Sequence, residues 1–195
     1  MIYPLYEKRI KEGLEIFPAE LCLMLSGEEV SISPDKLLDV LQWVKEFPAI
    51  KRFIIHVSTD TPEAVSIPFE GMAAVSAVRM SSPAGDISAG AGSPEVLVVV
   101  GKCGRQEICE AVAKIAVSGI RPDDITEDTI EQNLLYQVTP DFVIKTGGNN
   151  LADFLIWQSV YSELFFSDVN WAKFRRVDFL RALRDFQSRQ RRFGK

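Results

Sequence analysis

The chain has 195 residues and a formal net charge of −5, with 47% hydrophobic and 25% charged residues. This length is enough for one domain with a hydrophobic core, and the composition excludes a disordered or fibrous chain. The negative net charge provides no general footprint for nucleic acid, so no nucleic-acid partner is expected. Because no apolar run approaches the roughly 20 residues of a membrane span and the first residues lack a signal-peptide pattern, we expect a cytoplasmic protein.

The cysteines and the histidine limit the chemistry further. Cys22, Cys103 and Cys109 fit neither a disulfide framework nor a zinc-binding spacing. The single histidine, His56, lies in an apolar stretch typical of a strand, and it cannot by itself make a multi-histidine metal site. The chain also has no Walker-type phosphate loop and no dinucleotide-binding fingerprint. The common nucleotide-binding classes are therefore excluded.

The first third of the chain predicts a strand, a helix and a second strand. Residues 21–25 form a continuous apolar run, as expected for a strand that is buried on both faces. Ser33 is a candidate N-cap and Pro34 suits the first helical position, and apolar residues then recur at helical spacing as far as Val44. Residues 52–57 read as the second strand.

From residue 58 to residue 95 the pattern is irregular. Gly, Pro, Ala and Ser are frequent, so we expect a long loop with one weak helix near residues 71–80. Regular elements return after it. The predicted elements are a strand at 96–100, a helix at 105–117, a helix from Thr126 to Leu135, strands at 142–144 and 164–166, and helices near Asp153 and over 177–191. Strands that alternate with helices predict an α/β fold with a mainly parallel central sheet flanked by helices.

The C-terminal third carries the most specific motifs. They are Thr-Pro-Asp-Phe-Val-Ile-Lys-Thr-Gly-Gly at 139–148, Phe-Leu-Ile-Trp-Gln at 154–158, Tyr-Ser-Glu-Leu-Phe-Phe at 161–166, and the stretch 179–194. Together they resemble the cis-prenyltransferase family, whose type member is undecaprenyl diphosphate synthase. Residues 100–108 look like a degraded copy of a further family motif, and residues 5–27 and 36–59 align in order. The resemblance implies the family's fold as a single domain over 1–195, with an irregular loop at about 58–95 in place of the family's tunnel helices.

The resemblance also implies an activity from which this chain departs. The family extends an allylic diphosphate with isopentenyl diphosphate units, using magnesium, and makes long polyprenyl diphosphates. Ser26 stands where the family has its magnesium-binding Asp, and Glu28 and Glu29 stand at positions that cradle a diphosphate. A carboxylate about 4 Å from a phosphate oxygen costs roughly 4 kcal/mol at an effective dielectric constant near 20. We therefore expect no intact catalytic site.

Other family positions are kept or altered one by one. The candidates for residual phosphate or anion binding are Lys145, Gly147, Gly148 and Arg105, with Lys145 in place of the family's Arg. After these glycines the family's Arg-x-Ser loop is lost. Glu163 stands at the family's second metal-linked acid, and it is either a metal ligand or a structural carboxylate that pairs with Lys145 or Arg105.

The final residues resemble a noncatalytic subgroup of the family. The chain ends in Arg192-Phe-Gly194-Lys195, similar to the Arg-x-Gly terminus of the Nogo-B receptor, which pairs with a catalytic subunit. This likeness implies that Arg192 and Gly194 bind isopentenyl diphosphate in trans, in the partner's active site. The same basic tail is also typical of a solvated helix end.

Three functions remain open. The leading one is a noncatalytic accessory subunit of a heteromeric cis-prenyltransferase that makes dolichol- or undecaprenol-type carrier lipid. It would have no cofactor of its own, magnesium in the catalytic partner, peripheral membrane contact through that partner, and a homodimer as its form when alone. The alternative is a divergent active homodimer in which Glu163, Asp60 and Lys145 replace the missing groups. The third is a repurposed scaffold protein of the same fold.

Overall fold

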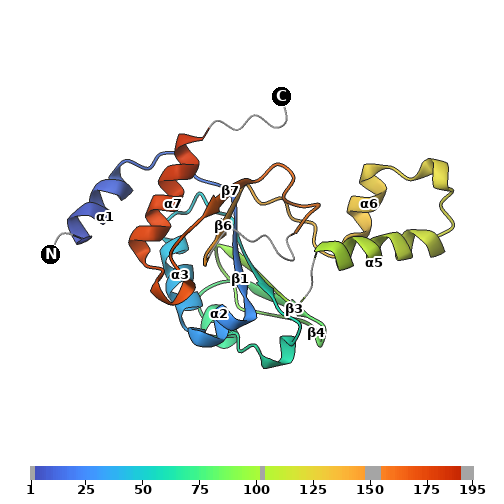
Figure 1. The fold of residues 1–195 in the computed structure, drawn as a ribbon, viewed down its shortest axis with the longest axis horizontal. Helices are drawn as coiled ribbons and strands as arrows, with labels where there is room; N and C mark the ends of the chain where they lie inside the picture. The colour runs from blue at the N-terminus through green and yellow to red at the C-terminus, as the bar shows by residue number, and fades with distance from the viewer. Residues whose placement is uncertain (1–2, 102–103, 148–154, 190–195) are drawn as a thin grey trace.

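The computed structural model describes residues 3–101, 104–147 and 155–189. Within these ranges seven strands form one mostly parallel sheet in the order β4-β3-β5-β2-β1-β6-β7, flanked by helices (Figure 1). The strands are β1 (Glu20–Ser26), β2 (Arg52–Ser58), β3 (Val78–Ser82), β4 (Gly85–Ala89), β5 (Glu95–Val100), β6 (Phe142–Lys145) and β7 (Glu163–Phe166). Only β4 runs antiparallel to its neighbour. The expected fold class is confirmed.

The helices connect these strands and follow them. They are α1 (Tyr3–Glu12), α2 (Gly27–Ile32), α3 (Lys36–Lys45), α4 (Phe69–Ala73), α5 (Gly104–Val117), α6 (Glu127–Asn133) and α7 (Arg176–Ser188), with 3₁₀ turns at η1 (Pro62–Ala64), η2 (Pro122–Asp124) and η3 (Trp171–Lys173). In the part of the chain that the structure describes, none of them is both long enough and apolar enough to cross a membrane.

The central strands are apolar throughout because both faces of the sheet are covered. In β1, Leu21, Leu23 and Leu25 face the larger core, while Cys22 and Met24 face a smaller one. This alternation follows from the two-residue repeat of a strand. Continuous apolar runs were the pattern that predicted these strands, and their burial on two sides explains the pattern.

The larger core lies under α1, α3 and α7, which gather on one side of the sheet (Figure 1). Leu37, Val40, Leu41 and Val44 of α3 are buried there, at the three- and four-residue spacing of one helix face. Burying side chains of this size stabilises the fold by about 1.5–3 kcal/mol each.

On the opposite side, α5 and α6 project from the sheet as a helix pair (Figure 1). Most of α5 is exposed, and its first half is attached to the sheet region through Glu107, which is 2% exposed. The smaller core on this side is completed by Tyr136, Val138 and Leu155 rather than by a long helix.

Several predicted elements differ from the structure. Ser33 does not cap α3: Asp35 precedes that helix, and Ser33 ends the short helix α2, which the sequence did not predict. The N-cap at Thr126 is confirmed by its hydrogen bond from the Thr129 N–H at 3.2 Å. The helix predicted near Asp153 begins outside the described residues, and residues 156–161 form turns.

The segment from 58 to 95 is more regular than expected. It contains η1, α4 and the β3–β4 hairpin, with α4 at Phe69–Ala73 rather than at 71–80. Strand β4 was missed because it is an edge strand with every residue exposed, so its sequence of small and polar residues carries no apolar alternation. The backbone at Gly90 has φ +79° and an added Cβ would lie 2.2 Å from the Ser76 carbonyl oxygen, which requires glycine after this hairpin.

Candidate functional site

The candidate site lies at the carboxyl ends of the parallel strands. Ser26 ends β1, Ser58 ends β2 and Lys145 ends β6, and Ser26 is directly opposite Ser58 in the register of the sheet. Ligands on such sheets bind at this edge. Two cavities open here, one of about 430 Å³ beside Ser26 and one of about 970 Å³ beside Asp60, and Ser58 lines both.

The first turn after β1 is a capping box. Ser26 has extended backbone angles (φ −87°, ψ 158°), and its hydroxyl accepts a hydrogen bond from the Glu29 N–H at 3.2 Å. In return, Oε2 of Glu29 accepts the Ser26 N–H at 2.8 Å. This exchange satisfies two N–H groups that have no partner within the helix. Ser26 therefore starts the helix α2.

The carboxylate of Glu29 also contacts the end of β6. Its Oε2 accepts from Lys145 Nζ at 3.3 Å, and its Oε1 accepts from the Thr146 hydroxyl at 3.0 Å. The side chains of Lys145 and Glu29 are only 15% and 17% exposed, so this ion pair is largely shielded from water. Lys145 is thus neutralised within the chain, by Glu29 rather than by Glu163.

Gly147 follows this contact with a backbone conformation that favours glycine. Its φ is +72°, and an added Cβ would lie 2.6 Å from Oε1 of Glu29. The positive φ disfavours other residues, and a side chain here would also displace the Glu29 carboxylate. Gly148, the next of the predicted anion-binding residues, lies outside the described residues, as do Arg192 and Gly194.

The larger cavity at this edge holds Asp60 and Arg105. Arg105 lies in the first turn of α5, and both side chains line the cavity together with Cys109. Within the described ranges, the side chains of Asp60 and Arg105 form no hydrogen bond or ion pair. A single cation opposite a carboxylate provides weaker anion binding than the paired arginines typical of phosphate sites.

Glu163 lies away from this edge. It is the first residue of β7 and pairs with Phe142, which in turn pairs with Leu21. Ser26 is five residues farther along β1, so about 16 Å separates the two levels of the sheet. Glu163 forms an ion pair with Arg189 at 3.2 Å. It is not paired with Lys145 or Arg105, the partners expected for the structural alternative.

The residues at this edge do not fit a magnesium site. Ser26 provides a hydroxyl where a carboxylate is needed, and Glu29 is held by Lys145 and Thr146. Among the residues that the structure describes, no group of three or more His, Cys, Asp or Glu side chains is arranged to hold a metal ion.

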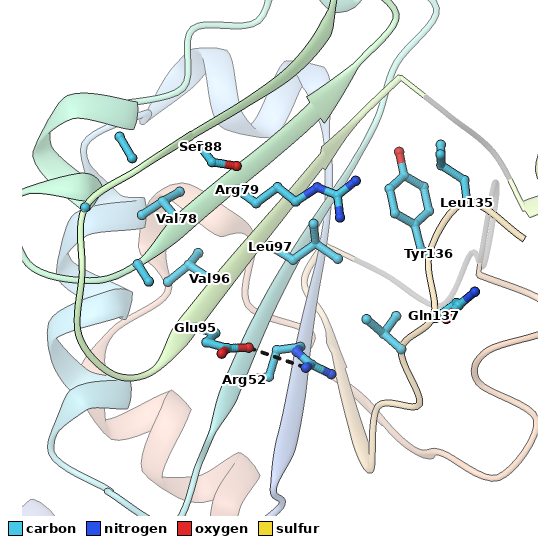
Figure 2. A pocket seen from close by; sticks show the side chains of 14 residues that line it. Arg52, Val78, Arg79, Ser88, Glu95, Val96, Leu97, Leu135, Tyr136 and Gln137 are labelled. Carbon is cyan, nitrogen blue, oxygen red and sulfur yellow. Dashed lines mark hydrogen bonds and ion pairs between the residues drawn. The ribbon is translucent and has the colours of Figure 1, made fainter.

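A third cavity, of about 680 Å³, lies at the other end of the sheet. Figure 2 shows the Arg52–Glu95 ion pair, 3.4 Å long, at one end of it and Arg79 extending toward Tyr136. Arg52 and Glu95 are the first residues of β2 and β5, so this cavity is at the amino ends of the parallel strands. It is separate from the predicted site.

Two buried side chains of the smaller core, Cys22 and Tyr136, remain protonated at physiological pH. Burial raises the pKa of the Cys22 thiol to about 12. The pKa of Tyr136 is also raised to about 12, chiefly by burial. Both groups are therefore neutral at physiological pH and provide no nucleophile.

Sequence reasoning placed Glu29 in the diphosphate cradle but missed its contacts. The spacing Ser26-x-x-Glu29 is a capping-box pattern and could have predicted α2. The hydrogen bond from Thr146 to Glu29 could not be predicted from a local motif, because it depends on the distance between β1 and β6.

Comparison with known proteins identifies the family. A sequence model described as "Putative undecaprenyl diphosphate synthase" matches residues 81–194, more than half of the chain. The chain therefore belongs to the undecaprenyl diphosphate synthase-like prenyltransferase family.

Individual relatives match about half of this chain. A tritrans,polycis-undecaprenyl-diphosphate synthase (geranylgeranyl-diphosphate specific) from Methanocaldococcus jannaschii is 50% identical over 109 residues, covering 51% of this chain and 39% of the relative. An isoprenyl transferase from Deinococcus radiodurans is also 50% identical over 109 residues, covering 50% of this chain and 40% of the relative. The chain thus spans about two fifths of the length of these relatives.

Solved structures share the fold over more of the chain. A probable undecaprenyl diphosphate synthase from Campylobacter jejuni superposes with a TM-score of 0.66 at 17% identity, covering 93% of this chain and 100% of that one. The lavandulyl diphosphate synthase of Lavandula x intermedia, in complex with dimethylallyl diphosphate, gives a TM-score of 0.62 at 21% identity, with coverage of 92% and 99%. At these identities the likeness establishes the fold alone.

Proposed function

We propose that this chain is a noncatalytic accessory subunit of a heteromeric cis-prenyltransferase that makes long-chain polyprenyl diphosphate. The observation that carries the proposal is the position of the Glu29 carboxylate. It accepts from the Ser26 N–H, from Lys145 and from Thr146, which are groups that an anionic substrate would need.

Electrostatics supports this proposal. A diphosphate at the end of β1 would have to displace Glu29 from Lys145 and then remain beside the displaced carboxylate. Like charges at such distances repel by about 1–4 kcal/mol, depending on solvent exposure. Glu28, exposed in the same turn, adds a second negative charge. The chain's own carboxylate therefore competes with any anionic substrate at this edge.

In this proposal the work is divided between two subunits. The chemistry, the magnesium ion and the tunnel that sets chain length belong to the catalytic partner. Residues 1–195 act as a single domain, and Arg192 and Gly194 bind isopentenyl diphosphate in the partner's site. The protein is cytoplasmic, and its membrane contact is made through that partner.

The second candidate is an active prenyltransferase that works alone. It is favoured by the 50% identity, over about half of this chain, to relatives that are named as a synthase and as an isoprenyl transferase. The alternative expected Glu163, Asp60 and Lys145 to replace the missing groups. Glu163 is paired with Arg189 and Lys145 with Glu29, so Asp60 in the larger cavity is the remaining candidate, with Arg105 lining the same cavity.

An assay of isopentenyl incorporation into an allylic diphosphate separates the candidates. We expect no turnover by this chain alone, even at high protein concentration with magnesium, and turnover when a catalytic subunit from the same cell is added. Turnover by the chain alone would contradict the proposal and support the second candidate. If the chain is inactive alone and does not change the activity of the catalytic subunit, the result supports a scaffold protein instead.

The tail is tested in the mixed enzyme. Arg192→Ala is expected to lower the activity without dissociating the complex, with Arg184→Ala on the exposed surface of α7 as the basic control. Equal activity of the two variants and the wild type would show that the tail does not act in trans.

A further inference from the structure

The sheet has an open edge at β4, its outermost strand (Figure 1). Strand β4 pairs with β3 on one side, and every one of its residues is exposed. In the part of the chain that the structure describes, no strand pairs with its other side, where alternate backbone N–H and C=O groups point away from β3. The opposite edge strand, β7, is partly buried at every residue. The β4 edge is therefore the more accessible of the two.

Strand β4 lacks the features that usually keep an edge strand from pairing with another chain. Such edges commonly carry lysine, proline or a bulge. None of these interrupts β4, which keeps a continuous register with β3 from Gly85 to Ala89. Its one charged residue, Asp86, is bound within its own sheet, because its carboxylate accepts from Arg79 at 2.6 Å and from the Ser81 hydroxyl at 2.6 Å. An approaching strand therefore meets a charge that is already compensated.

The sequence of β4 is complementary to itself in antiparallel orientation. With a two-fold axis at Ile87, this residue lies opposite its own counterpart, and Asp86 lies opposite Ser88 of the second copy. The remaining pair, Gly85 and Ala89, has no bulky side chain. Like charges do not face each other in this register, and the serine hydroxyl can donate to the aspartate. The charge pattern therefore favours a second copy of this chain as the partner.

Ile87 provides the apolar part of this surface. It is 47% exposed and pairs with Met80 of β3, which packs against the larger core. Residues that lie directly opposite each other on two strands share one face of the sheet, so Ile87 extends the larger core toward the open edge. Two copies of Ile87 placed side by side would shield each other from water.

We propose that β4 pairs with β4 of a second copy of this chain in antiparallel orientation, so that one sheet runs through both copies. Backbone hydrogen bonds provide the affinity, and the pair of Ile87 side chains fixes the register. Strands of this length bury less than the roughly 1,200 Å² of a stable interface, so the dimer is weak, with a dissociation constant on the order of 100 µM. This pairing does not depend on the proposed accessory role.

Sedimentation velocity of the full chain tests the pairing. The wild type is expected to change from monomer to dimer between about 5 µM and about 500 µM. Ile87→Lys places two like charges opposite each other at the two-fold axis, so the dissociation constant should rise at least about tenfold. Because Ile87 is exposed, the fold is retained. Val117→Lys makes the same change at an exposed apolar residue of α5 and, as the matched control, leaves the dimer unchanged.

Hydrogen exchange of the wild type tests the edge without any substitution. The amides of residues 85–89 are expected to exchange more slowly at about 500 µM than at about 5 µM, whereas those of α5 keep the same rate. The proposal is overturned if the wild type stays monomeric, even where a peptide of the β4 sequence protects the edge. It is also overturned if Ile87→Lys dimerises as well as the wild type, or if Val117→Lys abolishes the dimer instead.

Discussion

Two groups of carboxylates in this protein differ in how they are satisfied. At the carboxyl ends of β1 and β6, Glu29 accepts from a backbone N–H, a hydroxyl and an ammonium group of its own chain. On α6, Glu127, Asp128 and Glu131 have no such partners within the described ranges. Glu29 lies at the carboxyl ends of the parallel strands, where ligands usually bind on such sheets, whereas the α6 carboxylates lie elsewhere.

The difference shows that charge must be judged together with its partners. Lys145 looks like an anion-binding residue in the sequence, but Glu29 already occupies it. The α6 carboxylates look like a solvated helix face, but they line a cavity of about 530 Å³ and lack such partners within the described ranges. Four substitutions test this contrast.

Lys145→Met is expected to have the largest effect. It removes the cation from Glu29 while keeping the length of the side chain, and it leaves a carboxylate that is only 17% exposed beside an apolar group. The free energy of unfolding should fall by about 2–3 kcal/mol, between the values for exposed and fully buried pairs. Urea denaturation measures it. A loss below about 0.5 kcal/mol would mean that the Glu29 carboxylate is hydrated and does not depend on its partners in the chain.

Glu29→Gln tests the same contact from the other side. The amide oxygen can still accept the Ser26 N–H, but the ion pair with Lys145 is lost. We expect a loss of about 1–2 kcal/mol. Glu28→Gln in the same turn is the matched control, since Glu28 is exposed and should change stability by less than about 0.5 kcal/mol.

Glu46→Gln tests a carboxylate outside both groups that, like Glu29, is paired with cations of its own chain. Burial alone raises the pKa of the Glu46 carboxyl, but the hydrogen bonds from Arg176 and Lys11 outweigh it, so the pKa lies below its ordinary value of 4.5. Since the pKa is lower in the folded state, the stabilisation is complete above about pH 4.5 and is lost as the pH falls through the folded value. Glu46→Gln should cost about 1 kcal/mol at pH 7 and nothing at the acid end. Thermal unfolding from pH 7 to pH 3 measures this, and a constant difference would contradict it.

Glu131→Gln is expected to have the smallest effect. The carboxylate has no partner to lose within the described ranges, and its removal relieves repulsion from Glu127 and Asp128. The free energy of unfolding should stay within about 0.5 kcal/mol of the wild type, or rise slightly. The same Glu→Gln change thus separates the two groups, and equal losses at Glu29 and Glu131 would remove the distinction.

The sequence predicted the central strands well because burial on both faces leaves a signal in every residue. The runs at 21–25, 52–57 and 96–100 lie within strands of nearly the same bounds. Strand β4 leaves no such signal, since none of its residues is buried. Short elements such as α2 depend on capping rather than on periodicity, so they are found only by searching for the capping pattern.

The sequence predicted the location of the candidate site, but not whether its lysine is free to bind a ligand. Ser26, Lys145 and Gly147 do meet at one edge of the sheet. Whether Lys145 is available depends on Glu29, which lies 116 residues away in the chain. Glu163 was placed by motif alone, and the register of β6 and β7 puts it near the other end of the sheet. Distances between separate strands are not encoded in local pattern.

The order of the strands has a consequence for how this family can diverge. The family match covers residues 81–194, whereas β1 and β2 precede it in the chain and lie between β5 and β6 in the sheet. The matched residues are therefore interrupted in space by two strands that lie outside the family match. A fragment that keeps only the matched residues would lack the two middle strands and could not close the sheet. The segment that matches the family model is therefore smaller than the segment needed to fold. The smallest fragment able to fold must also include β1 and β2.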